Sequence, residues 1–141
     1  MKKDTCLIGR NSEAKALQFF IEQGYNVSLP FGGQARYDLL VDIGSQILRI
    51  QVKTGSYKEG CVIFCTSSSH YLQGHHVHTT YTKEDIDYFF VECNNQCYLV
   101  PVEECGREKR LRIDEPSKFA PKNSINWAKD YLATEVLKTL E

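Results

Sequence analysis

The stretch RYDLLVDIGSQILRIQVKTG, residues 36–55, decides the fold of this chain. Apolar and polar residues alternate on both sides of Gly44-Ser45, which is typical of two half-buried strands. A glycine at the first position of a two-residue turn permits the primed turn types that close a tight hairpin. The sequence therefore predicts an antiparallel β-hairpin that turns at Gly44-Ser45.

The turn determines which residues face one another across this hairpin. With Gly44-Ser45 as the turn, Asp38 lies opposite Gln51, and directly opposed side chains share a face with Cβ atoms roughly 5 Å apart. Lys53 projects from the same face two residues further along. That face therefore ends in a carboxylate, an amide and an amine. The other face is wholly apolar and should be buried: Leu39, Val41, Leu48, Ile50 and Val52.

A helix precedes the hairpin. Asn11-Ser12 is a plausible helix N-cap, and apolar residues at helical spacing then predict a helix over about residues 12–23, stopped by a glycine. Glu13 lies two helical turns before Phe20, so we expect it to extend the core-facing stripe. Because burying an unpaired charge is costly, this carboxylate needs a partner, and a metal ion or Lys53 would serve.

The rest of the chain predicts an α+β fold with a mixed sheet and flanking helices, built as one domain over residues 1–141. We expect the first helix to cover the sheet. The other predicted segments are strands at 26–29, 61–66, 86–93 and 97–102, a polar, strand-poor loop from 67 to 85, a charged segment at 106–114, a proline-punctuated linker at 116–124, and a C-terminal helix from Ile125 to Leu140.

Composition limits the class of protein. A chain of 141 residues with 42% hydrophobic residues can bury a single core, so disorder is not expected. No apolar stretch approaches the roughly 20 residues of a membrane span, and the N-terminus lacks a secretory signal, so we expect a cytoplasmic protein with six reduced cysteines. The net charge of −1 means that contacts to a nucleic acid must come from local clusters.

Glu13, Asp38, Gln51 and Lys53 have the chemistry needed for phosphodiester hydrolysis. Carboxylate and amide oxygens from the first three residues suit Mg²⁺, which would acidify a water and neutralise charge on a phosphate. Lys53 would hold or deprotonate the attacking water, or stabilise the transition state. In the alternative interpretation, Asp38 pairs with Arg36 or Lys53 on a solvated sheet face, and Gln51 and Glu13 are ordinary polar residues.

These residues resemble the PD-(D/E)XK nuclease superfamily, which carries an acid on one strand and an acid-or-Gln, any residue and Lys on the next. Here they are Asp38 and Gln51-Val52-Lys53, with Glu13 matching a helical glutamate of resolvase-like members. An ordered series of segments resembles, more narrowly, small PD-(D/E)XK endonucleases that include those of the cyanobacterial group I intron homing type. The segments are GRNSEAKAL, LPFGGQARYDLLVD, IQVKTG, the serine run at 67–69, DIDYFFVEC, YLVPVEE, LRI and INWAKDYL.

The resemblance implies a restriction-endonuclease-like αβββαβ core, Mg²⁺-dependent DNA cleavage with Mn²⁺ as a substitute, and a homodimer or homotetramer acting on double-stranded DNA. Two departures from the family pattern stand out. Tyr37 replaces the proline of the motif and changes no ligand. Gln51 replaces the second acid, which removes a charge and should weaken metal binding. Asp42 could compensate only if the ion lay toward the turn.

Basic and histidine-rich segments are candidates for DNA contact, as opposed to solvated charged loops. The predicted phosphate ligands would position the nucleic acid without reading its sequence. The four histidines and six cysteines match no familiar zinc spacing, so an extended loop that reaches DNA is the favoured interpretation of residues 70–81. The candidates are Arg36, Lys58, His75, His76, Arg107, Lys109 and Arg110.

Four functions remain open from the sequence. The favoured one is a site-specific endonuclease of the homing type, which needs two active centres and therefore a symmetric oligomer to cut both strands. A Holliday-junction-resolvase-like enzyme would use the same chemistry on branched DNA. A non-catalytic DNA-binding module would explain Gln51, and a thiol- and histidine-based domain would carry zinc.

Overall fold

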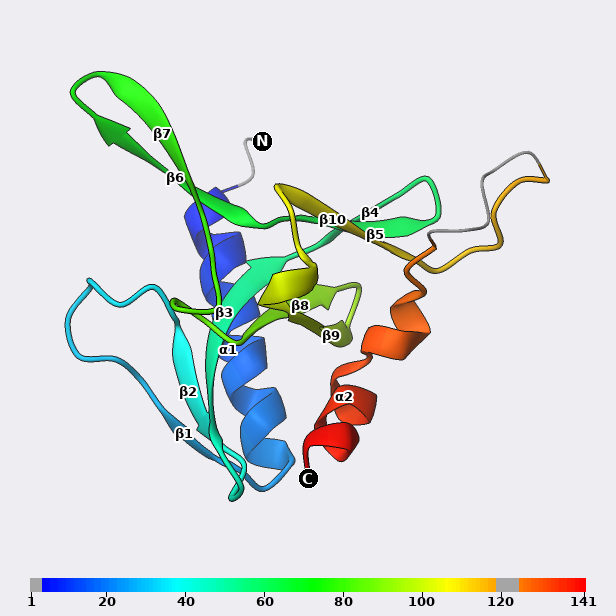
Figure 1. Cartoon of the computed structure of the whole chain (residues 1–141), viewed down its shortest axis with the longest axis horizontal. Coiled ribbons are helices and arrows are strands. Elements are labelled where there is room, and N and C mark those ends of the chain that lie inside the picture. Colours follow the sequence, from blue (N-terminus) through cyan, green and yellow to red (C-terminus); the bar gives the residue numbers. More distant parts are fainter. Residues whose placement is uncertain (1–3, 119–124) are drawn as a thin grey trace.

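The computed structural model describes residues 4–118 and 125–141, without the side chain of His70. Residues 119–124 of the expected linker lie outside it. The elements in chain order are α1 (Thr5–Glu22), β1 (Asn26–Ser28), β2 (Leu39–Asp42), β3 (Ile47–Thr54), β4 (Ser56–Lys58), β5 (Cys61–Cys65), β6 (Ser67–Leu72), β7 (His75–Thr80), β8 (Tyr88–Cys93), β9 (Gln96–Pro101), the 3₁₀ helix η1 (Val102–Glu104), β10 (Glu108–Arg112), the 3₁₀ helix η2 (Ala128–Tyr131) and α2 (Ala133–Leu140) (Figure 1).

The predicted hairpin is the start of a five-stranded mixed sheet in the order β1-β2-β3-β8-β9. Leu39 pairs with Ile50 and Asp42 with Ile47, which is the register that the Gly44-Ser45 turn predicts. Gly44 has φ +91°, and the Ile43 amide donates to the Gln46 carbonyl at 3.0 Å across the turn. β3 and β8 are parallel, whereas the other neighbouring strands of this sheet are antiparallel.

Two apolar clusters lie on opposite faces of this sheet. The predicted buried face of the hairpin, with Leu48 2% and Ile50 0% exposed, packs against Phe20 of α1 and Leu137 of α2. The other cluster joins Phe89 and neighbouring residues of β8 and β9 to a second sheet, ordered β10-β5-β4. The expectation that the first helix covers the sheet is therefore confirmed. Neither described helix has the length and apolar character required to cross a membrane.

Helix α1 begins earlier than predicted. Its N-cap is Asp4, whose carboxylate accepts from the amides of Cys6 and Leu7, so the predicted start at residue 12 was wrong. The buried stripe of the helix is Ser12, Ala16 and Phe20. Glu13 is exposed beside this stripe and does not extend it, because Ser12 takes the inward position and bonds Thr54 of β3 at 2.5 Å between hydroxyl oxygens.

The connection from β3 to β8 contains strands and no helix within the described residues 55–87. Gly55 permits this path, because a Cβ there would lie 2.8 Å from Val62 Cγ1 and 3.1 Å from Val91 Cγ1. The chain turns at Gly55 into β4 and β5, which pair with the later strand β10. The second helix of the expected αβββαβ order is thus replaced by β4 to β7.

The segment predicted as a strand-poor loop is a two-stranded hairpin, β6–β7, that projects from the body of the molecule (Figure 1). The prediction failed because both strands are polar and lack the apolar alternation that signals a half-buried strand. The charged segment at 106–114 was predicted without any secondary structure. Its residues 108–112 form strand β10, in which Lys109 and Leu111 face inward.

The predicted C-terminal helix is interrupted. Ala128 to Tyr131 form the 3₁₀ helix η2, Leu132 adopts extended backbone with ψ 130°, and α2 begins only at Ala133. Tyr98 of β9 forms an isolated bridge with Leu132 at this point, which explains why a continuous apolar spacing does not give one continuous helix.

Candidate active site

Asp38, the residue just before β2, is held by the neighbouring strand β3. Its amide donates to the Ile50 carbonyl at 2.7 Å, and its Oδ2 accepts from the Val52 amide at 2.8 Å. The side chain is half-buried, and this burial raises the pKa of the Asp38 carboxyl even though the Val52 amide and the charge of Lys53 lower it. The fold therefore presents a carboxylate in fixed orientation and at an electrostatic cost.

Lys53 lies on the same side of β3 and is also half-buried. Its Nζ donates to the Ser67 carbonyl at 3.2 Å and lies 5.3 Å from the centre of the Tyr81 ring. Burial lowers the pKa of Lys53, although Cys65 and Asp38 oppose the shift. The amine is thus positioned by backbone contact and loses its proton more readily than a solvated lysine would.

Glu13 approaches Asp38 from α1. Burial and then the negative charge of Asp38 raise the pKa of the Glu13 carboxyl. Two carboxylates that repel each other are the environment in which a cation binds favourably. The structure therefore brings Glu13, Asp38 and Lys53 together, although Glu13 reaches this place from an exposed helix position.

Gln51 lies on β3, two residues before Lys53. In the β3–β8 register it pairs with Phe89, and it shares the face of the strand from which Lys53 projects. Amide and carboxylate oxygens suit a hard divalent cation, so Glu13, Asp38 and Gln51 fit such an ion chemically. No group of three or more His, Cys, Asp or Glu side chains suited to a metal occurs in residues 4–118 and 125–141, and Gln51 explains why this site contains only two acids.

The guanidinium of Arg36 binds groups of the protein itself. It pairs with Asp85 at 2.7 Å and donates to the Ser68 hydroxyl at 3.2 Å. It also donates to two backbone carbonyls, that of Thr80 at 2.9 Å and that of Thr79 at 3.4 Å. The guanidinium carbon lies 4.1 Å from the centre of the Tyr81 ring. Arg36 therefore anchors the base of the β6–β7 hairpin beside Asp38. The alternative pairing of Arg36 with Asp38 is not the one observed.

Sequence reasoning placed Ser67 and Ser68 near the site, with one hydroxyl assisting a metal-bound water or a phosphate, and expected Tyr81 to contact DNA, but it left Asp85 out of the site. Asp85 was expected only to set up the strand that follows it; instead it accepts from Arg36 and from the Thr82 amide at 2.9 Å. The distance along the chain between Arg36 and Asp85 hides their pairing. Asp87, also expected near the start of that strand, binds the Arg49 amide at 2.8 Å.

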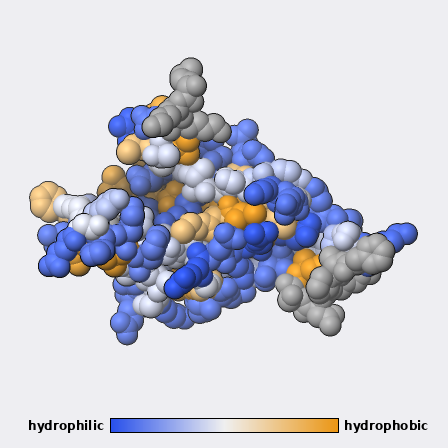
Figure 2. All heavy atoms as spheres, turned by 90° about the horizontal axis from the view of Figure 1, so that it is seen from above, coloured by the Kyte–Doolittle hydropathy of each residue, from blue (hydrophilic) through white to orange (hydrophobic). Residues whose placement is uncertain are grey.

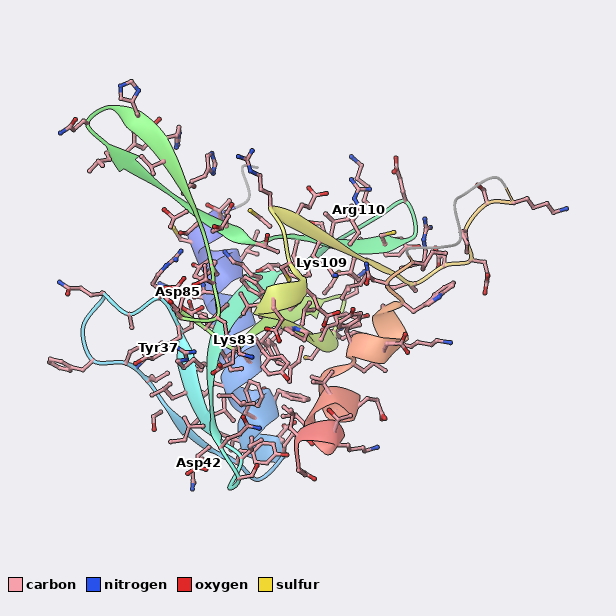
Figure 3. All side chains as sticks on the ribbon, in the orientation of Figure 1. Tyr37, Asp42, Lys83, Asp85, Lys109 and Arg110 are labelled. Carbon is pink, nitrogen blue, oxygen red and sulfur yellow. The ribbon has the colours of Figure 1, made fainter. Side chains whose placement is uncertain are left out.

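Asp42 does not supplement the site. Its Oδ1 accepts from the Gly44 amide at 2.8 Å and so caps the hairpin turn. Figure 3 shows Asp42 at the lower end of the β2–β3 hairpin, well separated from Tyr37 and Asp85. A metal near Asp38 would thus lack this third carboxylate.

The predicted DNA ligands are scattered. Lys58 is exposed on β4, and His75 and His76 lie at the outer end of the β6–β7 hairpin. Lys109 is 9% exposed and donates to the Glu104 carbonyl at 2.9 Å, and Arg110 pairs with Glu108 at 3.1 Å. Among these seven candidates, only Arg107 lines the cavity that Ser67 also lines, and Ser67 accepts a hydrogen bond from Lys53. The visible surface in Figure 2 is mostly hydrophilic, with small, separate apolar areas.

Comparisons with known proteins identify the family and the fold of the chain. A family model described as PD-(D/E)XK endonuclease matches residues 3–134. A solved structure of a bacterial homing endonuclease, I-Ssp6803I, aligns with a TM-score of 0.76 and 22% sequence identity, covering 96% of this chain and 95% of that one. At this identity the structural match establishes a shared fold. No curated protein matches the chain.

Proposed function

We propose that this chain, which belongs to the PD-(D/E)XK endonuclease family, is a divalent-metal-dependent endonuclease that cuts both strands of a DNA target site in the manner of a homing endonuclease. The observation that carries the proposal is the convergence of Asp38, Glu13 and Lys53. Burial raises the pKa of both carboxyls, the charge of Asp38 raises the pKa of Glu13 further, and the lysine lies beside them with a lowered pKa.

Glu13, Asp38 and Gln51 are the residues that would hold the metal, with Mg²⁺ the expected ion and Mn²⁺ a substitute. The bound ion supplies Lewis acidity and charge neutralisation at the phosphate. Asp38 is oriented by the Val52 amide through Oδ2, so its other oxygen remains available as a ligand. The half-buried position excludes part of the solvent, which strengthens electrostatic interactions at the site.

Lys53 would act on the attacking water. Its lowered pKa makes the neutral amine more accessible, which suits a group that accepts a proton, and its ammonium form would stabilise negative charge in the transition state. The bond to the Ser67 carbonyl holds Nζ in place before substrate binds. Cutting both strands at one site needs two such centres, which favours a symmetric dimer or tetramer.

The test is incubation of the purified protein with plasmid and genomic DNA in Mg²⁺, Mn²⁺ or EDTA. The proposal expects discrete, metal-dependent fragments that the Lys53→Met variant does not produce. Absence of cleavage by the wild-type protein in every metal would contradict it.

Gln51 and Glu13 each motivate a second candidate. Because Gln51 reduces the charge available to a metal, the same fold could serve as a non-catalytic DNA-binding module, which would bind DNA equally with and without Mg²⁺. The helical Glu13 favours a junction-resolving enzyme, which would prefer a four-way junction to linear duplex. Binding and cleavage assays with both DNA forms separate these functions from site-specific cutting.

A further inference from the structure

A cavity of about 310 Å³ lies beside Lys53, outside the group of proposed metal ligands. Its lining comes from the end of β5, the base of the β6–β7 hairpin and the residue before β10. The lining residues are Cys65, Ser67, His78, Thr80 and Arg107. This volume is at the lower end of the range of about 300–1,000 Å³ for ligand clefts.

The lining offers donors and no carboxylate. Ser67 and Thr80 supply hydroxyls, His78 an imidazole and Arg107 a guanidinium, which is the side chain best suited to binding phosphate oxygens. The nearest acid on the facing strand, Glu108, pairs with Arg110 at 3.1 Å. The cavity is therefore suited to an anion.

The cavity is connected to the catalytic lysine through Ser67. The carbonyl of Ser67 accepts from Lys53 Nζ at 3.2 Å, while Ser67 itself lines the cavity. Hydrogen bonding to Ser67 lowers the pKa of the Cys65 thiol, and the positive charge of Lys53 lowers it further, whereas burial and the negative charge of Glu108 raise it. These contacts place the cavity next to the phosphate on which Lys53 would act.

One face of the hairpin extends from this cavity to the hairpin tip. The β6–β7 register puts Ser67 opposite Thr80, Ser69 opposite His78 and Tyr71 opposite His76, and alternate residues of a strand share a face. We call these six residues the cavity face. The rings of Tyr71 and His76 contact each other at a tilt of 43°, with 4.0 Å between ring centres.

The β6–β7 hairpin and the residues beside it carry no negatively charged side chain. No acidic residue occurs between Glu59 and Glu84, although the chain has 18 acids in 141 residues. A neutral-to-basic projection with hydroxyls, imidazoles and an aromatic ring is complementary to a nucleic-acid backbone.

We propose that the cavity is a phosphate subsite, which binds a backbone phosphate next to the one being cut, with Arg107 and His78 as its ligands. The cavity face then guides the flanking DNA toward the hairpin tip. The inference rests on the proposed function, because its ligand is a phosphate of the DNA substrate. It assigns one specific phosphate of that substrate as the ligand of Arg107.

The first test is the salt dependence of binding to a short duplex of arbitrary sequence, measured in EDTA so that no cleavage intervenes. We expect Arg107→Gln to weaken binding about tenfold and to reduce the slope of log affinity against log salt by about 0.9, the contribution of one phosphate contact. The control is Lys138→Gln on α2, where the lysine pairs with Glu135 at 3.1 Å, and this variant should bind as the wild type does.

A second pair of variants tests the face of the hairpin. His78→Ala removes a cavity ligand and should weaken duplex binding several-fold. Leu72→Ala alters the opposite face, since Leu72 pairs with His75, and should change affinity less than twofold. Equal effects of the two variants would contradict the assignment of the cavity face.

Cys65 provides a reporter of occupancy that does not depend on activity. It is exposed and lines the cavity, so its alkylation by iodoacetamide, followed by mass spectrometry, should slow several-fold when saturating duplex is present. Arg107→Gln should reduce this protection at equal DNA concentration.

The outcomes separate the subsite from the proposed function. Wild-type affinity and salt slope in Arg107→Gln, or unchanged alkylation of Cys65 under saturating duplex, overturns the subsite even if the protein cuts DNA. Weakened binding in Arg107→Gln without cleavage by the wild type supports the subsite and overturns the catalytic proposal. If the wild type binds no duplex, both proposals are wrong.

Discussion

The β2–β3 and β6–β7 hairpins differ in what holds them. In β2–β3, one face is buried between the sheet and the helices, with Leu48 2% and Val41 0% exposed. The β6–β7 hairpin is a separate two-stranded sheet with mostly exposed residues. An isolated two-stranded hairpin is marginally stable in water, so contacts at its base must hold it.

Those contacts also connect the two hairpins. Arg36, just before β2, binds Ser68 and the carbonyls of Thr79 and Thr80, while Lys53 of β3 binds the Ser67 carbonyl. The comparison shows that one hairpin is stabilised by apolar burial and the other by polar contacts with the candidate site. Movement of the β6–β7 base would therefore alter the position of Lys53.

The largest effect is expected from Lys53→Met. We expect cleavage to fall by about 100-fold or more, because the proton-transfer or charge-stabilising group is lost, while the fold remains intact. Cleavage rates and circular dichroism measure the two properties. The control is Lys138→Met on the exposed side of α2, which should cut normally. Wild-type cleavage by Lys53→Met would show that the site is assigned to the wrong residue.

Removal of one apolar side chain from each hairpin should separate their stabilities. Leu48→Ala should lower the free energy of unfolding by about 2–5 kcal/mol, because it leaves a cavity in the core. Val77→Ala, in the partly exposed β7, should lower it by less than about 1 kcal/mol. Urea denaturation measures both values, and similar losses would mean that β6–β7 belongs to the same cooperative core.

Arg36→Lys should loosen the β6–β7 hairpin without unfolding the sheet. A lysine cannot replace the fork of donors that reaches Asp85, Ser68 and the two carbonyls. We expect faster amide hydrogen exchange in residues 67–80, unchanged exchange in β2–β3, and about tenfold slower cleavage. Asp42→Asn is the control at the far end of β2–β3; equal exchange in Arg36→Lys and wild type would remove the proposed coupling.

Asp38→Asn should abolish cleavage and yet raise the melting temperature by about 2–4 °C in EDTA. Burial raises the pKa of Asp38 in the folded state above its unfolded-state pKa of 3.8. The free energy of unfolding therefore falls as the pH rises from 3.8 through the pKa of the folded state, because the carboxyl ionises at a cost in the folded protein. The asparagine retains an oxygen for the Val52 amide but carries no charge. The difference in melting temperature should therefore be present at pH 7 and disappear below about pH 4; an equal or lower melting temperature at pH 7 contradicts the prediction.

The smallest effect is on Glu13. Because the charge of Asp38 contributes to the raised pKa of Glu13, Asp38→Asn should move that pKa back toward its ordinary value. Side-chain carbon NMR during a pH titration, without metal, measures the shift. A Glu13 pKa that is identical in both proteins would show that the two carboxylates do not interact.

The prediction of the β2–β3 hairpin succeeded because local chemistry decides it. Gly44 selects the turn, and the alternating apolar residues select the buried face and hence the register. The predicted start of α1 and the predicted continuous C-terminal helix were wrong, since an early cap at Asp4 and a bridge from Tyr98 to Leu132 override helical spacing. Propensity is a weak guide wherever tertiary contacts compete with it.

The sequence by itself determined the register of β2–β3 and the shared face of Gln51 and Lys53, because turn geometry and a side-chain period of two are local properties. Only the tertiary structure brought Glu13 near Asp38. It also paired Arg36 with Asp85 at the base of the β6–β7 hairpin, and it placed Arg107 and His78 around one cavity. These juxtapositions join residues distant along the chain. They depend on how helices and sheets pack, which no local pattern of residues encodes.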